Sequence, residues 1–316
     1  LLAVGLGFAW IGQALMFSSF MLYDDEGYVL ITLRDFGLHG GLYNQVYSQY
    51  GPFFYLCYDT LHRVLGFEWT SSSGRWITLF NWLGTAGLCG AIVARCRLPL
   101  ALVAFTFASV FTLLWINVRE PTHPGSFTSL LVALAALLGA EALHANRPRR
   151  FAITIGVIGS ALALIKINVG AFIFLAAISW LALSNSSRKP QPAPILLAGL
   201  GLLLPFVLMR SLLGESWVLT FACVSGASIA GALLAAAPAA RSRQADTATW
   251  GWLAGPAVLM ALAVSAAILA RGTGPMDLLE GVLLGPLRHP GAYAFAANWR
   301  TGALAVATLA LLGTFY

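Results

Sequence analysis

Charged residues are scarce in this sequence of 316 residues: Asp, Glu, Lys and Arg make up 9% of it, and 59% of the residues are hydrophobic. Soluble domains carry about 25% charged residues. Together with a mean hydropathy of +0.81, this scarcity excludes an ordinary soluble protein and predicts an all-α polytopic membrane protein. The first apolar stretch lacks an Ala-x-Ala cleavage pattern, so we interpret it as a spanning helix and not as a signal peptide.

Several motifs of catalysis and metal binding are also missing. No P-loop, G-x-S-x-G or H-E-x-x-H pattern occurs, so a nucleotide-driven pump, a serine hydrolase and a zinc protease are unsupported. The four cysteines form no C-x-x-C pair and indicate neither a metal site nor a disulfide framework. The chain has no internal repeat, and its compositional bias is limited to the Ala and Leu of the apolar runs.

Apolar runs near the length of about 20 residues that a span needs predict roughly ten transmembrane helices. The predicted spans are 1–21, 76–94, 98–116, 125–143, 151–166, 168–184, 194–213, 217–237, 250–270 and 301–316. The apolar run at 50–67 carries Asp59, His62 and Arg63, so we expect a helix that lies at the interface. The chain starts without Met and ends inside an apolar run, and we interpret 1–316 as a single transmembrane domain that is C-terminally incomplete.

The basic residues predict the orientation of the chain, because Lys and Arg concentrate in short cytoplasmic loops. With the N-terminus inside, only Glu141 and Asp246 of the 12 acidic residues lie on the inner side. We expect the outer segments 22–75, 116–126 and 271–300 to form the active-site face. The inner loops hold Arg95, Arg97, Arg147, Arg149, Arg150, Arg188, Lys189, Arg241 and Arg243.

Three consecutive carboxylates, Asp24, Asp25 and Glu26, follow the first span in the stretch "YDDEGYVL". They are either solvated residues at a helix end or part of a reaction centre. Asp24 can cap a helix predicted for 25–36, and acids suit the positive end of such a helix. We expect this helix to be amphipathic and to lie along the membrane surface, with the carboxylates at the level of the headgroups. Its apolar side is formed by Val29, Leu30, Ile31, Leu33 and Phe36.

The stretch "DDEGYVLITLRDFGLHGGLYNQVYSQYGPFFYL" resembles the first outer loop of the GT-C membrane glycosyltransferases, and in particular the bacterial branch related to protein mannosyltransferases and aminoarabinose transferases. Those enzymes carry an Asp-Glu pair just after the first span, then an amphipathic helix and a Tyr-Gly-Pro-like entry to the next helix. Here the pair is Asp25-Glu26 and the entry is Tyr50-Gly51-Pro52. Weaker similarity in "RWITLFNWLGTAGLCGAIVAR", "LALIKINVGAFIF" and "LLEGVLLGPLRHPGAYAF" extends along the chain.

The resemblance implies a glycosyltransferase that moves a sugar, with inversion, from a polyprenyl-phosphate donor to a hydroxyl of a lipid, glycan or protein acceptor. It implies a bacterial inner membrane location, contact with membrane lipids, a periplasmic active site and no nucleic-acid partner. Such transfer needs a carboxylate base for the acceptor hydroxyl and cations for the leaving phosphate. By the motif match we expect Asp25 to be the base, and Glu26 to hold it or to shift its pKa through like charge.

Four basic residues are candidates for binding the donor phosphate, and each has a structural alternative. Arg34 can pair with Asp35 or with a lipid phosphate, and Arg75 can be an interfacial anchor. Lys166 is expensive in hydrocarbon, so it either reaches the outer surface or pairs within the helix bundle. The candidates are Arg34, Arg75, Lys166 and Arg288.

The candidates for contact with acceptor or sugar are Asp24, Tyr50, Glu120, His123 and His289. Glu120 and His123 could share a helix face and hold a metal, but two prolines argue against a regular helix there, and no second His is nearby. We expect a metal-independent enzyme without cofactor, with a divalent cation left open. The alternative is a transporter or flippase of lipid-linked sugars with Lys166 in a charge relay, and a third interpretation is a non-catalytic scaffold in which Asp25 and Glu26 are replaceable.

Overall fold

The computed structural model describes residues 2–19, 25–115, 118, 120–184, 193–241, 245–288, 298–300 and 302–314. The described residues are mainly helical and contain no strand, only an isolated bridge between Leu42 and Val46. Five helices are long and apolar enough to cross a membrane, which fits a multi-pass, all-α membrane protein. They are α4 (Ser71–Arg95), α6 (Pro124–His144), α8 (Ile167–Ser184), α10 (Ser216–Arg241) and α11 (Ala248–Ala270).

The other predicted spans correspond to shorter helices. These are α1 (Leu2–Ser18), α5 (Leu100–Leu114), α7 (Pro148–Ala163), α9 (Ala193–Leu208) and α14 (Ala303–Gly313). The sequence thus predicts the positions of these helices, and five of the ten reach the length of a span within the described residues.

Two compact units make up the chain. Unit 1 comprises residues 1–173 and 252–286. Besides α1, α4–α7 and most of α11, it holds α2 (Asp25–His39), α3 (Pro52–Leu65), α12 (Pro275–Leu279) and the π-helical turn η3 (Glu280–Leu284). Unit 2 comprises residues 174–251 and 287–316, in which α9, the turn η2 (Arg210–Leu212), α10 and α14 lie; the short α13 (Gly285–Arg288) begins in unit 1.

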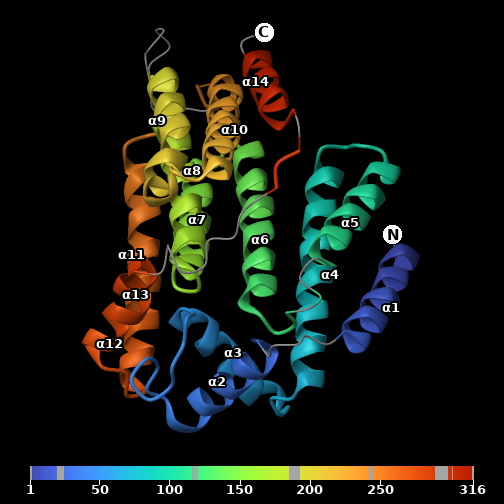
Figure 1. Ribbon diagram of the computed structural model, residues 1–316, viewed down its shortest axis with the longest axis vertical. Helices are drawn as coiled ribbons and strands as arrows, with labels where there is room; N and C mark the ends of the chain where they lie inside the picture. The colour runs from blue at the N-terminus through green and yellow to red at the C-terminus, as the bar shows by residue number, and fades with distance from the viewer. Residues whose placement is uncertain are drawn as a thin grey trace. The chain divides into compact units, whose positions relative to one another are not determined.

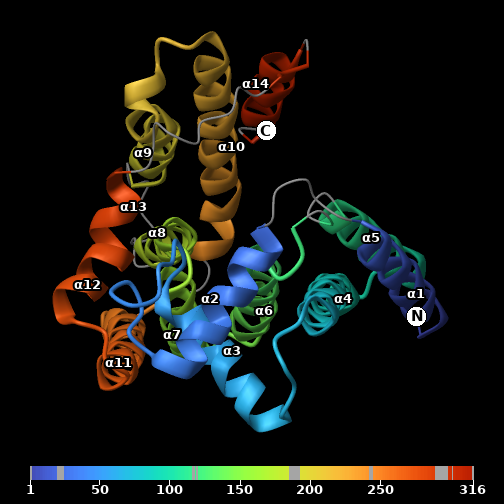
Figure 2. The same cartoon turned by 60° about the horizontal axis from the view of Figure 1, so that its bottom comes forward.

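Helices α2 and α3 lie at one end of α4, α6 and α7 within unit 1 (Figures 1 and 2). Helix α3 begins at Pro52, where the missing N–H costs nothing, and ends at Leu65; the next residue, Gly66, has a φ of 67° and caps the last turn with a bond from its N–H to the His62 carbonyl. We call this the α2–α3 end. At the other end of α4 and α6, Arg95 and Glu141 form an ion pair of 2.8 Å.

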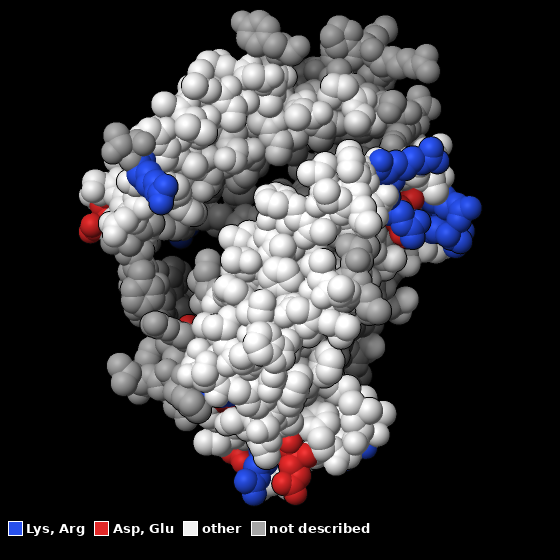
Figure 3. Space-filling view, turned by 90° about the vertical axis from the view of Figure 1, so that its right-hand side faces the viewer, with Lys and Arg blue, Asp and Glu red and all other residues white. Residues whose placement is uncertain are grey.

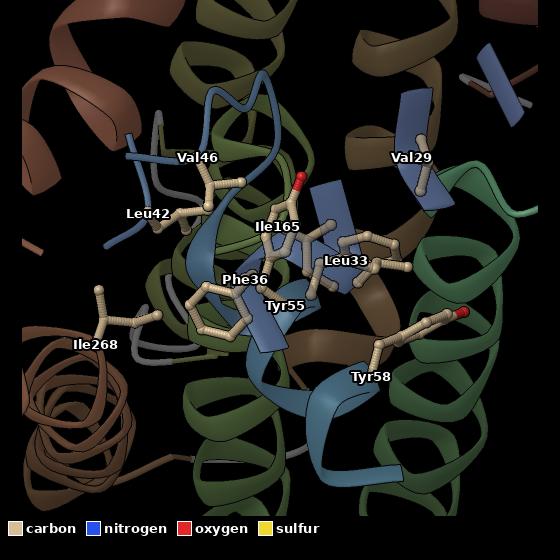
Figure 4. Packing of buried hydrophobic residues seen from close by; sticks show 10 residues of the cluster. Val29, Leu33, Phe36, Leu42, Val46, Tyr55, Tyr58, Ile165 and Ile268 are labelled. Atoms are coloured by element: carbon tan, nitrogen blue, oxygen red, sulfur yellow. The ribbon is translucent and has the colours of Figure 1, made fainter. Parts of the chain in front are cut away.

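A buried apolar cluster holds α2 and α3 in place. The cluster combines side chains from α2 and α3, from the loop between them, from the α7–α8 corner and from α11; in Figure 4 most of them lie around Phe36 and Tyr55, with Val29 and Ile268 at opposite edges. Each fully buried side chain of this size contributes about 1.5–3 kcal/mol relative to an exposed one. The labelled members are Val29, Leu33, Phe36, Leu42, Val46, Tyr55, Tyr58, Ile165 and Ile268.

The outer surface of the helices is apolar. In the space-filling view most of the face is white and charged side chains are few (Figure 3). Helix α11 exposes Val258, Leu259 and Leu262, each at more than half of its full area. A helix that exposes such side chains suits a lipid environment, which agrees with the length and composition of the five long helices.

Candidate functional site

Glu26 and Arg75 form a bidentate ion pair at the α2–α3 end. Arg75 donates from Nε to Glu26 Oε1 at 2.9 Å and from Nη2 to Oε2 at 2.7 Å, and its Nη1 donates to the Met16 carbonyl at 2.8 Å. The Arg75 side chain is 5% exposed and that of Glu26 13%. Paired forks of this kind combine strength with fixed geometry. The pair therefore ties the first turn of α2 to the first turn of α4 and the end of α1.

Asp25 precedes Glu26 in the first turn of α2 and has a different environment. Its side chain is partly buried, and within the described part of the chain it takes part in no ion pair. Its negative charge acts on the phenols of Tyr28 and Tyr50. The two neighbouring acids thus differ in their partners: Glu26 pairs with Arg75, whereas the charge of Asp25 acts on two tyrosines.

The Tyr50-Gly51-Pro52 stretch docks on the corner between α7 and α8. Gly51 donates its N–H to the Ile165 carbonyl at 2.9 Å, and Phe53 donates to the Leu164 carbonyl at 3.0 Å. A Cβ at position 51 would overlap the Leu164 carbonyl oxygen, so the close approach requires glycine. This docking places the Tyr50 ring 5.6 Å from Lys166 Nζ.

Lys166 lies between α7 and α8, outside both helices. Burial lowers the pKa of its ammonium, and the negative charge of Glu120 opposes that shift. Among the described residues it forms no ion pair within 4 Å. An ammonium that is partly desolvated and has no close carboxylate can attract an anionic ligand.

His123 caps the N-terminus of α6. Its Nδ1 accepts the Gly125 N–H at 3.0 Å, and its ring meets the Tyr50 ring at 89° with centroids 5.3 Å apart. Burial first, and then the positive charge of Lys166, lower the pKa of this imidazole from 6.5 to about 4. His123 is therefore neutral at neutral pH.

The residues before His123 are held in a strained turn. Thr122 has a φ of 68°, which is costly for a β-branched residue. Its N–H donates to Thr78 Oγ1 at 2.8 Å, and a Cβ on Gly74 would overlap its side chain. The turn presents Glu120 near enough to interact electrostatically with Lys166 and Tyr50.

These contacts bring together five of the predicted site residues. The Tyr50 ring lies 5.6 Å from Lys166 Nζ and 5.3 Å from the His123 ring, and the charges of Asp25 and Glu120 act on its phenol. Burial, followed by the charge of Asp25, raises the pKa of the Tyr50 phenol, which therefore stays protonated. We call Asp25, Tyr50, Glu120, His123 and Lys166 the open cluster.

The remaining predicted site residues are not part of the open cluster. Arg34 is exposed on α2, and Arg75 is engaged with Glu26. Asp24 and His289 lie outside the described residues, and the side chain of Arg288, the last residue of α13, is likewise not described.

A second charged centre at this end was not predicted. Asp59 is 4% exposed, and its Oδ2 accepts from Arg63 Nε at 2.9 Å and from Arg271 Nη1. Arg271 also donates to the Phe36 carbonyl at 3.0 Å, which ties the end of α11 to α2 and α3. The signal was an Asp in a largely apolar helix with an Arg four residues later, because a buried carboxylate requires a partner.

The described residues contain no group of three or more His, Cys, Asp or Glu side chains placed to hold a metal. Glu120 and His123 therefore lack, in the described ranges, the third protein donor that most catalytic zinc sites have.

Comparisons with protein-family models, with curated proteins and with solved structures give no match. The class of the protein rests on the chain itself, which has the composition and helices of a multi-pass membrane protein.

Proposed function

We propose that the chain is a GT-C-type glycosyltransferase, in which Asp25 takes the proton of an acceptor hydroxyl as the acceptor attacks the anomeric carbon of a polyprenyl-phosphate sugar. The observation that carries the proposal is the open cluster. It combines a carboxylate without an ion-pair partner among the described residues, a partly desolvated ammonium and a neutral imidazole around one tyrosine.

The division of roles follows from the charges. Asp25 and Glu120 are the carboxylates of the cluster, and only Asp25 matches the motif of the family in position. Lys166 is the cation best placed to bind the leaving phosphate, because it contacts Tyr50 and has no ion pair in the described ranges. Arg75 acts through Glu26 by fixing the first turn of α2, and so positions Asp25.

The membrane setting also supports the proposal. His123 caps α6 and Lys166 directly precedes α8, and both helices could cross a membrane, so a ligand with an isoprenoid tail could present its phosphate there. We place this end at the periplasmic face of a bacterial inner membrane, because the opposite ends of α4 and α6 adjoin the arginine-rich loops.

The test is an assay of release of free polyprenyl phosphate by the chain reconstituted in lipid, with a panel of polyprenyl-phosphate sugars and acceptor hydroxyls. Asp25→Asn is compared with wild type and with Asp35→Asn, the same change made further along α2. We expect turnover in wild type and in Asp35→Asn, and a loss of at least about 100-fold in Asp25→Asn, the size of a general-base contribution.

Equal turnover in all three proteins would remove Asp25 as the base. Movement of the donor across vesicles without release of polyprenyl phosphate would contradict transfer and favour the transporter.

A further inference from the structure

The side chain of His123 has two nitrogens in different situations. Nδ1 accepts the Gly125 N–H at 3.0 Å as part of the cap of α6. An acceptor nitrogen carries a lone pair, so the proton of a neutral imidazole must be on the other nitrogen. The backbone of α6 therefore fixes the tautomer in which Nε2 carries the hydrogen.

The neutral state is maintained by the surroundings. Burial disfavours the imidazolium, and the positive charge of Lys166 adds to this effect. The negative charges of the cluster, Asp25 and Glu120, act on Tyr50, and Glu120 also acts on Lys166. His123 is thus a donor at Nε2 that adds no charge to the site.

The Nε2–H group has no hydrogen-bond acceptor among the described residues. Nε2 does not belong to the fully buried polar atoms that lack a partner, so it is not closed off from a ligand. The same holds for the Lys166 ammonium. Both donors lie near the ring of Tyr50, with Lys166 Nζ 5.6 Å and the centroid of the His123 ring 5.3 Å from its centroid, and two neighbouring donors with no acceptor of their own can bind an oxygen ligand. The ammonium selects an anionic oxygen, and a neutral second donor binds it without repelling Lys166.

We infer that His123 contacts the ligand as a fixed neutral donor, giving its Nε2–H to an oxygen of a lipid-linked phosphate monoester that Lys166 also binds. The same geometry assigns His123 neither the role of a general base nor that of a metal ligand, because its one lone pair is taken by Gly125. The identity of the lipid as a polyprenol rests on the proposed function, whereas the contact to phosphate does not.

Two substitutions distinguish the role of Nδ1 from that of Nε2. In His123→Asn the side-chain oxygen can replace Nδ1 as the cap, since Asn is a preferred N-cap residue, but no group reaches the Nε2 position. In His123→Gln the longer amide can supply a donor near Nε2 while the cap is lost. If His123 acts only as a helix cap, His123→Gln should lower the affinity for the ligand more than His123→Asn. If His123 donates to the ligand, His123→Asn should lower that affinity more.

The experiment measures binding of a polyprenyl phosphate without sugar to wild type, His123→Asn and His123→Gln in phosphatidylcholine nanodiscs. Parallel arms use phosphatidic acid and inorganic phosphate. We expect affinity to fall by about tenfold or more in His123→Asn, the value of a hydrogen bond to a charged group, and to fall less in His123→Gln. Nitrogen NMR of labelled histidine is expected to show a protonated Nε2 and an unprotonated Nδ1 in wild type at neutral pH.

Unchanged affinity in His123→Asn, or a proton on Nδ1, would overturn the inference. Absence of binding in wild type would overturn it too. Binding that depends on His123 but is equal for phosphatidic acid and polyprenyl phosphate, with no transfer from any donor, would support the phosphate contact and contradict the proposed function.

Discussion

Unit 1 contains two kinds of charged group at the α2–α3 end, and they differ in whether the charges are matched. Glu26–Arg75 and Asp59–Arg271 are closed pairs with direct hydrogen bonds. In the open cluster the charges of Asp25 and Glu120 act on Tyr50, and that of Glu120 also acts on Lys166, yet none of these three charged residues forms an ion pair within the described ranges. In a closed pair the carboxylate accepts hydrogen bonds from an arginine, so the two charges are matched within the protein. Charges that stay unmatched at a partly buried place are available to a ligand.

Asp25 and Glu26 show that a member of the open cluster and a member of a closed pair can be adjacent residues. They are adjacent in the sequence and in the first turn of α2, but Arg75 engages only Glu26. The difference between the two kinds of group can be tested by removing members of each, and the following changes are given from the largest expected effect on free energy to the smallest.

Asp59→Ala is expected to have the largest effect on stability. It leaves Arg271 without its carboxylate beside α2 and α3, and breaking a buried pair from one side costs about 3–5 kcal/mol. Because the Arg271 side chain is 24% exposed, water offsets part of that cost, and we expect a loss of about 3 kcal/mol in chemical unfolding. Glu68→Ala, which removes an acid outside α3, is the control; an equal loss there would contradict a special role of Asp59.

Glu26→Gln is expected to cost about 2 kcal/mol, because the buried guanidinium of Arg75 keeps its bond to the Met16 carbonyl and one bond to residue 26 but loses its counter-charge. Turnover is expected to fall with it, since the first turn of α2 carries Asp25. Adding Arg75→Met to Glu26→Gln removes the uncompensated cation. We expect the double variant to be at least as stable as Glu26→Gln; strictly additive losses would mean that the pair is not coupled.

Lys166→Met, in contrast to the changes in the closed pairs, is expected to weaken ligand binding and to leave stability almost unchanged. With no ion pair to break in the described ranges, and burial that disfavours the ammonium, stability should change by less than about 0.5 kcal/mol or rise. Affinity for polyprenyl phosphate should fall about tenfold, as for the loss of a charged hydrogen bond. Lys189→Met is the matched control. A clear loss of stability in Lys166→Met would assign Lys166 to the closed group.

His123→Asn is expected to change the pH dependence of stability. Between pH 6.5 and about 4 the unfolded chain binds a proton at this residue that the folded chain does not. The free energy of unfolding therefore falls as the pH is lowered through that window, by at most about 1.4 kcal/mol per pH unit for one proton. Unfolding measured across this range should be flatter in His123→Asn than in wild type. A curve in His123→Asn as steep as that of wild type would contradict the prediction.

The sequence predicts the helices of this fold well, because long apolar runs and turn residues are local signals. The helix predicted for 25–36 is confirmed as Asp25–His39, and the run at 50–67, for which a helix was predicted, contains the helix Pro52–Leu65. The pairing partners could not be predicted, since Glu26 and Arg75 are 49 residues apart and Asp59 and Arg271 are 212 apart. Such contacts depend on tertiary packing.

The site shows the same limit. Tyr50, His123 and Lys166 were predicted from residue type and resemblance, but their contact depends on Gly51 docking on the backbone of Leu164 and Ile165. The strained Thr122 and the tautomer of His123 also have no local sequence signal, because each is set by a hydrogen bond to another part of the fold or of its own turn.

The most direct test is to measure turnover and unfolding of Asp25→Asn in the same preparation, with the donor that wild type accepts. We predict that Asp25→Asn loses release of polyprenyl phosphate while its free energy of unfolding stays within about 0.5 kcal/mol of wild type, as for a change that breaks no ion pair. Turnover that is kept, or turnover and stability that fall together, would contradict the claim that the unmatched carboxylate serves chemistry and not the fold.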